Sequence, residues 1–221
     1  MRVAVMQPYF LPYAGYFRLF CNVDAFVVLD DVQFPRRGWV HRNRLRRHDG
    51  QLAWLTLPLA HAPRDTLIRD LAFHPRADSL WPARTRAFPA CDRPGAGAMV
   101  LVQAVNDLGA GFVDYQVRLL QATLESLGLP SPPLIRAGEA GVEEEFPGAA
   151  GRIIGLCRRL GADTYLNAPG GRTLYDAAVF ARHGILLEFL PPYRGDASSI
   201  LQRLNDERPE TVRREIADNL A

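Results

Sequence analysis

The first 31 residues contain a strand, a helix and a second strand in close succession, and this order restricts the fold more than any other part of the sequence. The apolar run at 2–6 predicts a strand, the pattern at 14–21 predicts a short helix, and the continuous apolar run at 25–31 predicts a strand buried on both faces. Together they predict a βαβ unit with parallel strands. Such units bind ligands at the carboxyl ends of their strands, which places the candidate sites from Gln7 and from Asp30 onward.

The rest of the chain resumes the alternation of strands and helices after a long excursion. Residues 32–60 predict a β-hairpin that turns at 48–50, and the proline-rich residues 60–112 predict an irregular insertion or lid. Helices are expected at 113–128 and 149–160, a short strand at 133–136, and a strand, glycine loop, helix and strand over 164–190. We therefore expect a single domain over 1–221 with an α/β, three-layer, Rossmann-like fold and a mostly parallel sheet.

Charge and cysteine content exclude several classes of protein. The chain has 26 basic and 24 acidic residues, and its net charge of +2 is too small to predict a nucleic-acid partner. Every basic residue is arginine, which excludes catalytic and P-loop lysines, so arginine, backbone N–H groups or a helix N-terminus must hold any anion. Three scattered cysteines, no signal-peptide pattern and no membrane-length apolar run predict a cytoplasmic protein without disulfides.

The loop QPYFLPYAGY, between the first strand and the first helix, is longer and more aromatic than a connector requires. Pro8 and Pro12 stiffen it, and the side chain of Gln7 would project over the end of the strand. Tyr13 and Tyr16 are three residues apart in a helical pattern, so both can face one ligand. We take Gln7, Tyr13 and Tyr16 as catalytic candidates. The alternative is that the aromatic residues only fill the core.

An acid pair, Asp30 and Asp31, follows the second predicted strand. Two acids at a strand end suit a metal ion, the hydroxyls of a ribose or a general base. In an extended chain they point in opposite directions, so we expect one of them to reach the site. The alternative is an exposed pair bonded to Arg36 or Arg37.

The segment RRGWVHRNRLRR at 36–47 combines arginines with a tryptophan. Its arginines could hold phosphate groups while the indole stacks on a base or packs against a sugar. Alternation places Trp39, His41 and Asn43 on one face and Arg42 and Arg44 on the other. The alternative is a solvated hairpin edge protected by charge. The candidates from this region are His41 for catalysis, and for binding Gln33, Arg37, Trp39, Arg42 and Asn43.

Two further stretches follow late strands. The glycine pair in NAPGGRTLYD at 167–176 could hold a phosphate or carboxylate with help from Arg172, and a tight turn is the alternative. The serines of YRGDASSIL begin a helix, and capping is the alternative. The binding candidates here are Asn167, Gly170, Gly171, Arg172, Tyr175, Ser198 and Ser199. The five histidines have no metal-ligand spacing, so we expect no metal.

These motifs resemble the WbqC-like protein family. The opening MQPYFLPYAGYFRLF, the strand VDAFVVLDDVQF, the segment RGWVHRNRLR and the late stretches CRRLGADTYLNAPGGRTLYDAAVFARHGI and SSILQRLND follow its pattern. The chain departs from that pattern at Asn167-Ala168, where relatives tend to have Ser-Gly, and at 88–95 and 136–150. Members of the family tend to be encoded with enzymes of sugar nucleotides, surface polysaccharides and natural products. The resemblance implies a transferase that moves an acyl or aminoacyl group to an amine or an amino sugar.

A second resemblance is to nucleotidyltransferases of the HIGH-signature class. They carry His-x-Gly-His where a helix opens after the first strand, and a serine-rich helix start after a late strand. In this chain Tyr13-Ala14-Gly15-Tyr16 and Ser198-Ser199 stand in the same order. The resemblance implies a HIGH-like nucleotide-binding fold whose chemistry has changed. A neutral phenol donates a single hydrogen bond, and this bond is weaker than one from a charged imidazole.

Three functions stay open at this point. An acyl or aminoacyl transferase would orient the amine and take its proton with Gln7, the acid pair and His41. It would hold a phosphate-bearing donor, such as a nucleotide, a thioester or the arm of a carrier protein, with Arg37, Arg42 and Arg172. A nucleotidyltransferase would bind an NTP over the first loop and Mg²⁺ at the acid pair. A non-catalytic module would bind a sugar nucleotide or a carrier protein.

Overall fold

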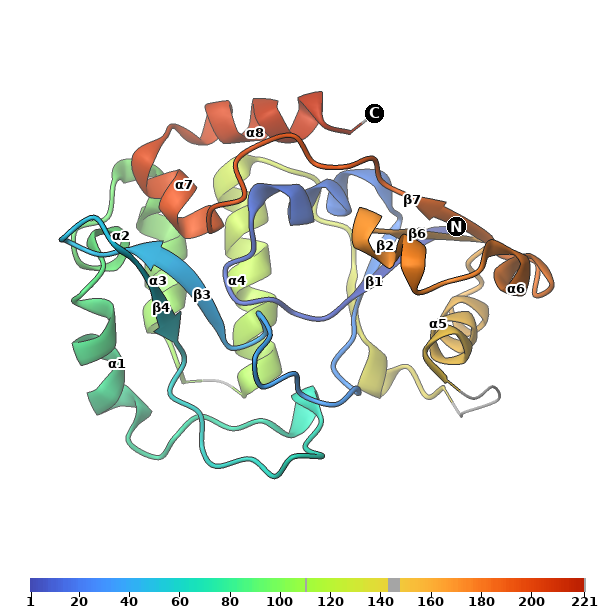
Figure 1. Ribbon diagram of the computed structural model, residues 1–221, viewed down its shortest axis with the longest axis horizontal. Helices are drawn as coiled ribbons and strands as arrows, with labels where there is room; N and C mark the ends of the chain where they lie inside the picture. The colour runs from blue at the N-terminus through green and yellow to red at the C-terminus, as the bar shows by residue number, and fades with distance from the viewer. Residues whose placement is uncertain (110, 143–147, 221) are drawn as a thin grey trace.

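The computed structural model (Figure 1) describes residues 1–109, 111–142 and 148–220, and a five-stranded parallel sheet forms its centre. The strands are β1 (Arg2–Met6), β2 (Ala25–Val28), β5 (Leu134–Arg136), β6 (Thr164–Asn167) and β7 (Leu186–Phe189), and they lie in the order β5-β2-β1-β6-β7. Counted along the chain within this sheet, the order is the doubly wound order of Rossmann-like folds. The strand order reverses between β1 and β6.

The ladder between β1 and β6 is short. β1 pairs with β2 at four positions, from Val3↔Ala25 to Met6↔Val28. It pairs with β6 only at Arg2↔Thr164 and Val3↔Tyr165, near the start of both strands. The hydrogen-bonded contact between β1 and β6 therefore ends before their carboxyl ends are reached.

Helices cover both faces of the sheet, as the three-layer prediction requires (Figure 1). On one face, Val3 and Val5 join a core with α5 (Gly148–Arg159) and α6 (Ala177–Ala181). On the other face, Ala4 joins the larger core, which includes residues of the 3₁₀ helix η1 (Ala14–Arg18), α4 (Phe112–Leu127), α7 (Ile200–Asp206) and α8 (Pro209–Asp218). Within the described residues no helix has the length and apolarity needed to cross a bilayer.

The predicted hairpin forms a separate two-stranded antiparallel sheet, β3 (Arg42–Arg46) and β4 (Leu52–Thr56), and Gly50 at its turn has a φ of +80°. Residues 60–112 are more regular than their prolines predicted. They contain η3 (Ile68–Asp70), α1 (Ala77–Thr85), α2 (Pro89–Asp92), η4 (Ala96–Ala98) and α3 (Met99–Asn106). The buried Trp81 Nε1 and Tyr115 hydroxyl each donate to the carbonyl of Val105 at 3.0 Å, which ties α1 and α4 to α3. A lid role for this segment stays a prediction.

Two of the expected element boundaries were wrong. The segment 14–21 forms two 3₁₀ helices, η1 and η2 (Phe20–Asn22), where we expected one helix. A 3₁₀ helix rises about 2.0 Å per residue, so it carries a short segment farther than an α-helix would. β2 ends at Val28, which leaves the acid pair in the loop that follows.

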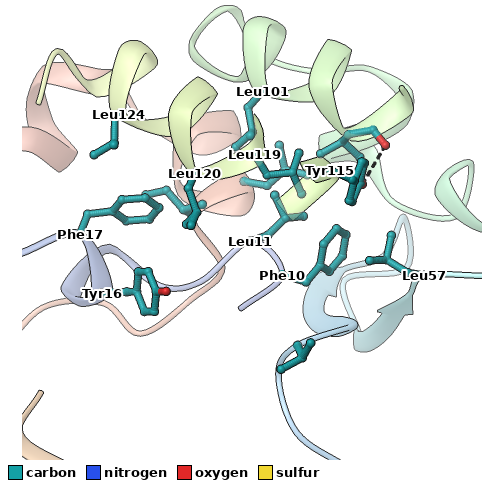
Figure 2. Close-up of a cluster of buried hydrophobic side chains, with 14 of the residues drawn as sticks. Phe10, Leu11, Tyr16, Phe17, Leu57, Leu101, Tyr115, Leu119, Leu120 and Leu124 are labelled. Carbon is teal, nitrogen blue, oxygen red and sulfur yellow. Dashed lines mark hydrogen bonds between the residues drawn. The ribbon is translucent and has the colours of Figure 1, made fainter. Parts of the chain in front are cut away.

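The opening loop is partly core, as the alternative interpretation held. Figure 2 shows Leu11 and Phe17 packed toward Leu119 and Leu120 of α4, and Phe10 beside Tyr115 of the same helix; all six are buried. The loop therefore lies between the sheet and α4, and its aromatic content is shared between the core and the surface that we describe next.

Candidate functional site

A cavity of about 820 Å³ lies at the carboxyl ends of β1 and β6. It is lined by Gln7 and later residues of the loop after β1, by Asn167 and the 3₁₀ helix η6 (Pro169–Thr173) after β6, and by Tyr193 and its neighbours after β7. We call it the strand-end chamber. It lies where the strand order reverses, which is where open α/β sheets bind their ligands.

Tyrosine dominates this chamber. Six of the seven tyrosines of the chain line it, namely Tyr9, Tyr13, Tyr16, Tyr165, Tyr175 and Tyr193. Burial raises the pKa of each of these phenols above its ordinary value, so all six stay neutral at physiological pH. The described residues that line the chamber include no Asp, Glu, Arg or His. The chamber is aromatic, rich in hydroxyl groups and uncharged.

Tyr13 and Tyr193 form one wall of the chamber. Their rings meet edge to face with centroids 5.4 Å apart. A Cβ atom on Gly15 would overlap both rings, so a glycine is needed at this position. The contact between the Tyr13 and Tyr193 rings therefore depends on the glycine of the HIGH-like segment Tyr13-Ala14-Gly15-Tyr16.

A buried cation lies behind this wall. Arg18 is fully buried, and its guanidinium lies 5.3 Å from the centroid of the Tyr193 ring. It donates to the backbone carbonyls of Gly15 (3.3 Å), Asn219 (2.6 Å) and Pro191 (2.9 Å). Carbonyl dipoles accept from three of its five N–H groups, but no carboxylate of the described residues pairs with it. Its positive charge therefore acts on the neighbouring chamber.

The glycine pair makes room for an amide. Asn167 is buried at the end of β6, and its Oδ1 accepts from the N–H of Ala168 at 2.8 Å. A Cβ atom on Gly171 would overlap the Asn167 amide, whereas one on Gly170 would meet open space. Gly171 thus lets Asn167 present its amide to the chamber, and Gly170 leaves the floor of the chamber open.

Tyr16 lines the chamber, but its hydroxyl group is already engaged. The residue is 3% exposed, and its hydroxyl donates to the carbonyl of Gln7 at 2.9 Å. This bond fixes the start of the loop over the end of β1. The hydrogen bond between the Tyr16 hydroxyl and the Gln7 carbonyl stabilises the loop. A catalytic role for Tyr16 and Gln7 stays a prediction.

A second cavity, of about 540 Å³, lies beside the first on the hairpin. Tyr9, Tyr13 and Ala197 line both cavities, so the two are neighbours. We call the second cavity the hairpin chamber and the two together the cleft. Its other walls include Trp39, Asn43, Arg44, Arg46, Asp196, Ser198 and Ser199.

The hairpin presents arginine and tryptophan on its outer face. Asn43 is buried in β3, whereas Arg44 is exposed, which is the alternation predicted for these two positions. The guanidinium groups of Arg42 and Arg44 lie 4.1 and 5.1 Å from the centroid of the Trp54 ring. Arg42 also donates to the carbonyl of Arg37 at 2.9 Å, so it anchors the preceding loop.

Two predicted binding residues hold the opening loop in an unusual conformation. Leu11 has a φ of +49°, which is uncommon for a residue with a side chain. Its carbonyl accepts from Asn43 Nδ2 at 2.6 Å and from Ser199 Oγ at 2.9 Å, and Asn43 Nδ2 also reaches the carbonyl of Phe10 at 3.0 Å. Asn43 and Ser199 line the cleft, but their polar groups act on the loop.

Asp196 brings a carboxylate to the cleft. It is the one carboxylate among the described residues that line either chamber. Burial raises its pKa, but a hydrogen bond from the N–H of Ser198, at 2.7 Å, and the charge of Arg203 outweigh this and hold the pKa below the ordinary value. Asp196 is therefore ionised at neutral pH.

The acid pair lies away from the cleft. Asp30 is buried and accepts from Arg136 Nε at 3.1 Å and from the N–H of Gly138, in η5 (Ala137–Glu139), at 2.8 Å. Asp31 forms an ion pair with Arg152. Neither acid lines either chamber, and both have arginine partners other than Arg36 and Arg37.

Five other candidates also lie outside the cleft lining: Gln33, Arg37, His41, Arg42 and Arg172. Gln33 donates to the carbonyl of Arg64 at 2.7 Å, and Arg172 stacks 4.9 Å from the centroid of the Phe189 ring. His41 packs edge to face on Phe34, and burial together with the charge of Arg42 lowers its pKa to about 4. In the part of the chain that the structure describes, no three His, Cys, Asp or Glu residues form a group able to hold a metal ion.

Several cleft residues were not among the sequence candidates: Tyr9, Arg44, Arg46, Tyr165, Tyr193 and Asp196. Tyr193 and Asp196 follow β7, so the same strand-end argument that selected Gln7 could have selected them. The hairpin alternation placed Arg44 opposite Asn43 without indicating which face borders a cavity. Tyr165 lies inside a buried strand, and no sequence signal marks it.

The fold and the cleft define a class: a Rossmann-like, three-layer α/β protein with an aromatic cleft at the reversal point of its sheet. The sequence profile of the WbqC-like protein family matches residues 7–195, and the chain belongs to that family. One relative is the "Uncharacterized protein Rv1507c" of Mycobacterium tuberculosis (strain ATCC 25618 / H37Rv). It is 28% identical over 193 residues, which cover 81% of this chain and 77% of the relative. No solved structure matches the chain.

Proposed function

We propose that this protein is a transferase that joins an acyl or aminoacyl group to the amine of a small ring compound, such as an amino sugar, in the biosynthesis of surface glycans or natural products. The observation that carries the proposal is the uncharged, tyrosine-lined chamber at the reversal point of the sheet, next to a chamber that holds arginines and a carboxylate. Aromatic faces pack against a sugar ring, while the phenol groups and the Asn167 amide supply hydrogen bonds to its hydroxyls.

The charge of the strand-end chamber favours the reactive form of an amine. An amine attacks a carbonyl only after it has lost its proton. The described lining offers no carboxylate to stabilise an ammonium group, and the buried guanidinium of Arg18 lies behind the Tyr13–Tyr193 wall. Both effects lower the pKa of an amine bound there.

Asp196 supplies a base in the hairpin chamber, next in sequence to Ala197, which lines both chambers. In the transfer, the amine nitrogen forms a C–N bond to the acyl carbon and the C–S bond of a thioester donor breaks. The nitrogen proton passes through the Asp196 carboxylate or water to the departing thiolate, so atoms and charge balance. In this scheme Arg44 and Arg46 replace the Arg37, Arg42 and Arg172 of the sequence hypothesis as the arginines nearest to a phosphate-bearing substrate.

Mass spectrometry tests this proposal directly. The purified chain is incubated with acyl and aminoacyl thioesters and a panel of amino sugars, and the products are searched for the mass of the acylated amine. We expect product with the wild type and a rate reduced about tenfold or more in Asp196→Asn. Arg214→Gln, which removes a charge on α8 outside the cleft lining, serves as the control. Product formation no higher than in a protein-free control, with every donor, would contradict the transferase.

A non-catalytic binding module is the second candidate, favoured by one observation. All six tyrosines of the strand-end chamber are held protonated, so its lining offers no group that titrates near neutral pH. The module predicts saturable binding of a sugar nucleotide or carrier protein without turnover, with Asp196→Asn altering affinity alone. A nucleotidyltransferase with Mg²⁺ at the acid pair has less support, because arginines already neutralise both acids.

A further inference from the structure

The cleft separates charge from aromatic surface in a way that selects a ligand with two unlike parts. The strand-end chamber is uncharged along its described lining and carries six phenol rings. The hairpin chamber holds two arginines and one carboxylate. A ligand that fills both chambers therefore needs a neutral ring at one end and an anionic group at the other.

Arg44 and Arg46 are available to an anion. Both side chains lie on the exposed face of β3, and no ion pair is formed by either with a described residue. Arg44 contacts the Trp54 ring as Arg42 does, but Arg42 also donates to the carbonyl of Arg37, whereas no hydrogen bond joins the Arg44 guanidinium to a described residue. Arginine pairs hold phosphate and pyrophosphate oxygens through several N–H donors at once.

The charge of Arg46 acts on Asp196, but the charge of Arg203 acts on it more strongly. The Asp196 carboxylate accepts from the N–H of Ser198 at 2.7 Å and lies 3.9 Å from the Nε of the buried Arg203. Arg203 in turn is bonded to Glu207 and Glu215. Asp196 is thus bonded within the C-terminal part of the chain, and β3 supplies the two cations of the chamber.

Trp39 completes the hairpin chamber with an aromatic face. It is 40% exposed, and its ring centroid lies 5.2 Å from that of Trp54. Its backbone carbonyl accepts from the N–H of Phe10 at 2.8 Å, which fixes the position of the residue. An exposed indole beside two arginines that form no ion pair with a described residue suits a nucleobase next to its phosphates.

We propose that the cleft binds a nucleoside diphosphate sugar, with the sugar in the strand-end chamber, the pyrophosphate at Arg44 and Arg46, and the base on Trp39. This inference rests on the proposed function and identifies the acceptor of the transfer. The acceptor is an amino sugar that carries a nucleoside diphosphate. The pyrophosphate contacts come from arginine alone, so binding proceeds without a divalent cation.

Calorimetry in the absence of any acyl donor tests binding apart from catalysis. The probes are nucleoside diphosphate sugars with each common base, the matching nucleoside diphosphates, N-acetylglucosamine 1-phosphate and inorganic pyrophosphate, each with and without EDTA. We expect at least one nucleotide sugar to bind more tightly than its nucleoside diphosphate and its sugar phosphate. The double variant Arg44→Gln/Arg46→Gln should weaken this binding about tenfold or more, and Arg214→Gln by less than about twofold.

A separate variant tests where the sugar lies. Gly170 lines the strand-end chamber and a Cβ atom there would meet no other atom within 4 Å, so Gly170→Phe adds a large side chain to the lining without a clash at Cβ. It should reduce the affinity for the nucleotide sugar to that of the nucleoside diphosphate, whose own affinity stays unchanged. Circular dichroism and thermal melting confirm that each variant is folded before titration.

The outcomes are distinguishable. Absence of binding by every nucleotide sugar, or an equal loss in the Arg214→Gln control, overturns the inference, while transfer to free amines can still occur. A sugar phosphate that binds as tightly as the nucleotide sugar overturns the contact of the base with Trp39. Tight binding of the nucleotide sugar without any transfer supports the inference and contradicts the transferase.

Discussion

At the scale of single residues, the hydrogen bonds of Asn43 hold the conformation of the opening loop. Its Nδ2 reaches two consecutive carbonyls, and one of them belongs to Leu11, whose backbone lies in the left-handed region. A backbone held in this region costs about 1–3 kcal/mol and persists only where its surroundings fix it. The conformation of the loop at the cleft therefore depends on these hydrogen bonds as well as on its two prolines.

Asn43→Ala should lower the free energy of unfolding by about 2 kcal/mol, because it leaves buried carbonyl groups without their donor. Chemical denaturation measures the change. Gln103→Ala, an exposed amide on α3, is the matched control and should change stability by less than about 0.5 kcal/mol. Equal stability of the two variants would show that Ser199 alone holds Leu11.

His41 should make the protein less stable in mild acid. Its folded pKa is about 4, below the ordinary value of 6.5, so the unfolded chain takes up this proton first as the pH falls. Stability is therefore lost between pH 6.5 and about 4, and this loss is complete below the folded pKa.

His41→Gln removes this contribution, and the comparison isolates it from the other groups that titrate in acid. Denaturation curves at pH 7 and pH 4.5 should show a smaller loss of stability in the variant than in the wild type. An identical loss in the two proteins would mean that His41 titrates normally in the folded state.

Single residues also show where prediction from the sequence stops. The adjacency of Asp30 and Asp31 is visible in the sequence, but their partners Arg136 and Arg152 are more than 100 residues away. A strand end can place an acid near a ligand or near another loop, and the distant arginines decide between the two. The position of Tyr13 was easier to predict than the partners of the acid pair, because the residue that it packs against, Gly15, lies in the same sequence motif.

At the scale of elements, the two glycines after β6 have different purposes. Gly171 lies against the amide of Asn167, and Gly170 faces open space. Neither glycine has a positive φ, so a substitution at the two positions differs only in the steric room that is available for a side chain.

Gly171→Ala should displace Asn167, lower stability by about 1–3 kcal/mol and weaken any ligand of the strand-end chamber. Gly170→Ala is the matched control and should leave stability unchanged or slightly raised. Thermal melting of both variants tests the difference. A Gly171→Ala protein as stable as the control would mean that the Asn167 side chain moves aside freely.

Elements with a strong local signal were predicted well. The apolar strands β1 and β6, the helix α4 with its C-cap Gly128 at φ +60° and the hairpin turn at Gly50 all form where the pattern indicates. The helices within 60–112 were missed because proline was taken as a breaker. Pro89 instead begins α2, where its missing N–H costs nothing, and packing of the buried Trp81 keeps Pro82 inside α1.

At the scale of the whole molecule, the C-terminal helices brace the cleft. Arg203 of α7 bonds Glu215 of α8 at 2.9 Å, and the Tyr193 hydroxyl donates to the same carboxylate. Arg18, near the start of the chain, reaches the carbonyl of Asn219 near its end. Contacts with α8 thus hold the wall formed by 193–197 in place. In the sequence α8 lies far from β1, whose carboxyl end borders the cleft.

Glu215→Gln should lower the free energy of unfolding by about 2–3 kcal/mol, because Arg203 is buried and loses a charged partner. Glu210→Gln on the exposed face of α8 is the control. Glu215→Gln should also weaken ligands of the cleft, since the Tyr193 hydroxyl loses its charged acceptor. Unchanged unfolding in Glu215→Gln would indicate that Glu207 alone balances Arg203.

The position of the cleft depends on strand order, which the sequence does not specify. The first βαβ unit predicted parallel strands and ligands at their carboxyl ends, and the structure has both strands. The chain, however, returns past β1 to add β6 and β7 on the other side, and only this arrangement places Tyr165 and Asn167 opposite Gln7. Long-range packing of α5 and α4 on opposite faces fixes that order.

The concentration of tyrosine in one chamber gives the molecule a built-in spectroscopic probe. Protein produced with fluorotyrosine would carry seven fluorine nuclei, and six of them would lie in the wall of the strand-end chamber. The seventh, at Tyr115, is buried beside α3 and would serve as an internal reference. A fluorine NMR titration would then register occupancy of the cleft, ring by ring, for a compound that absorbs no light and undergoes no reaction.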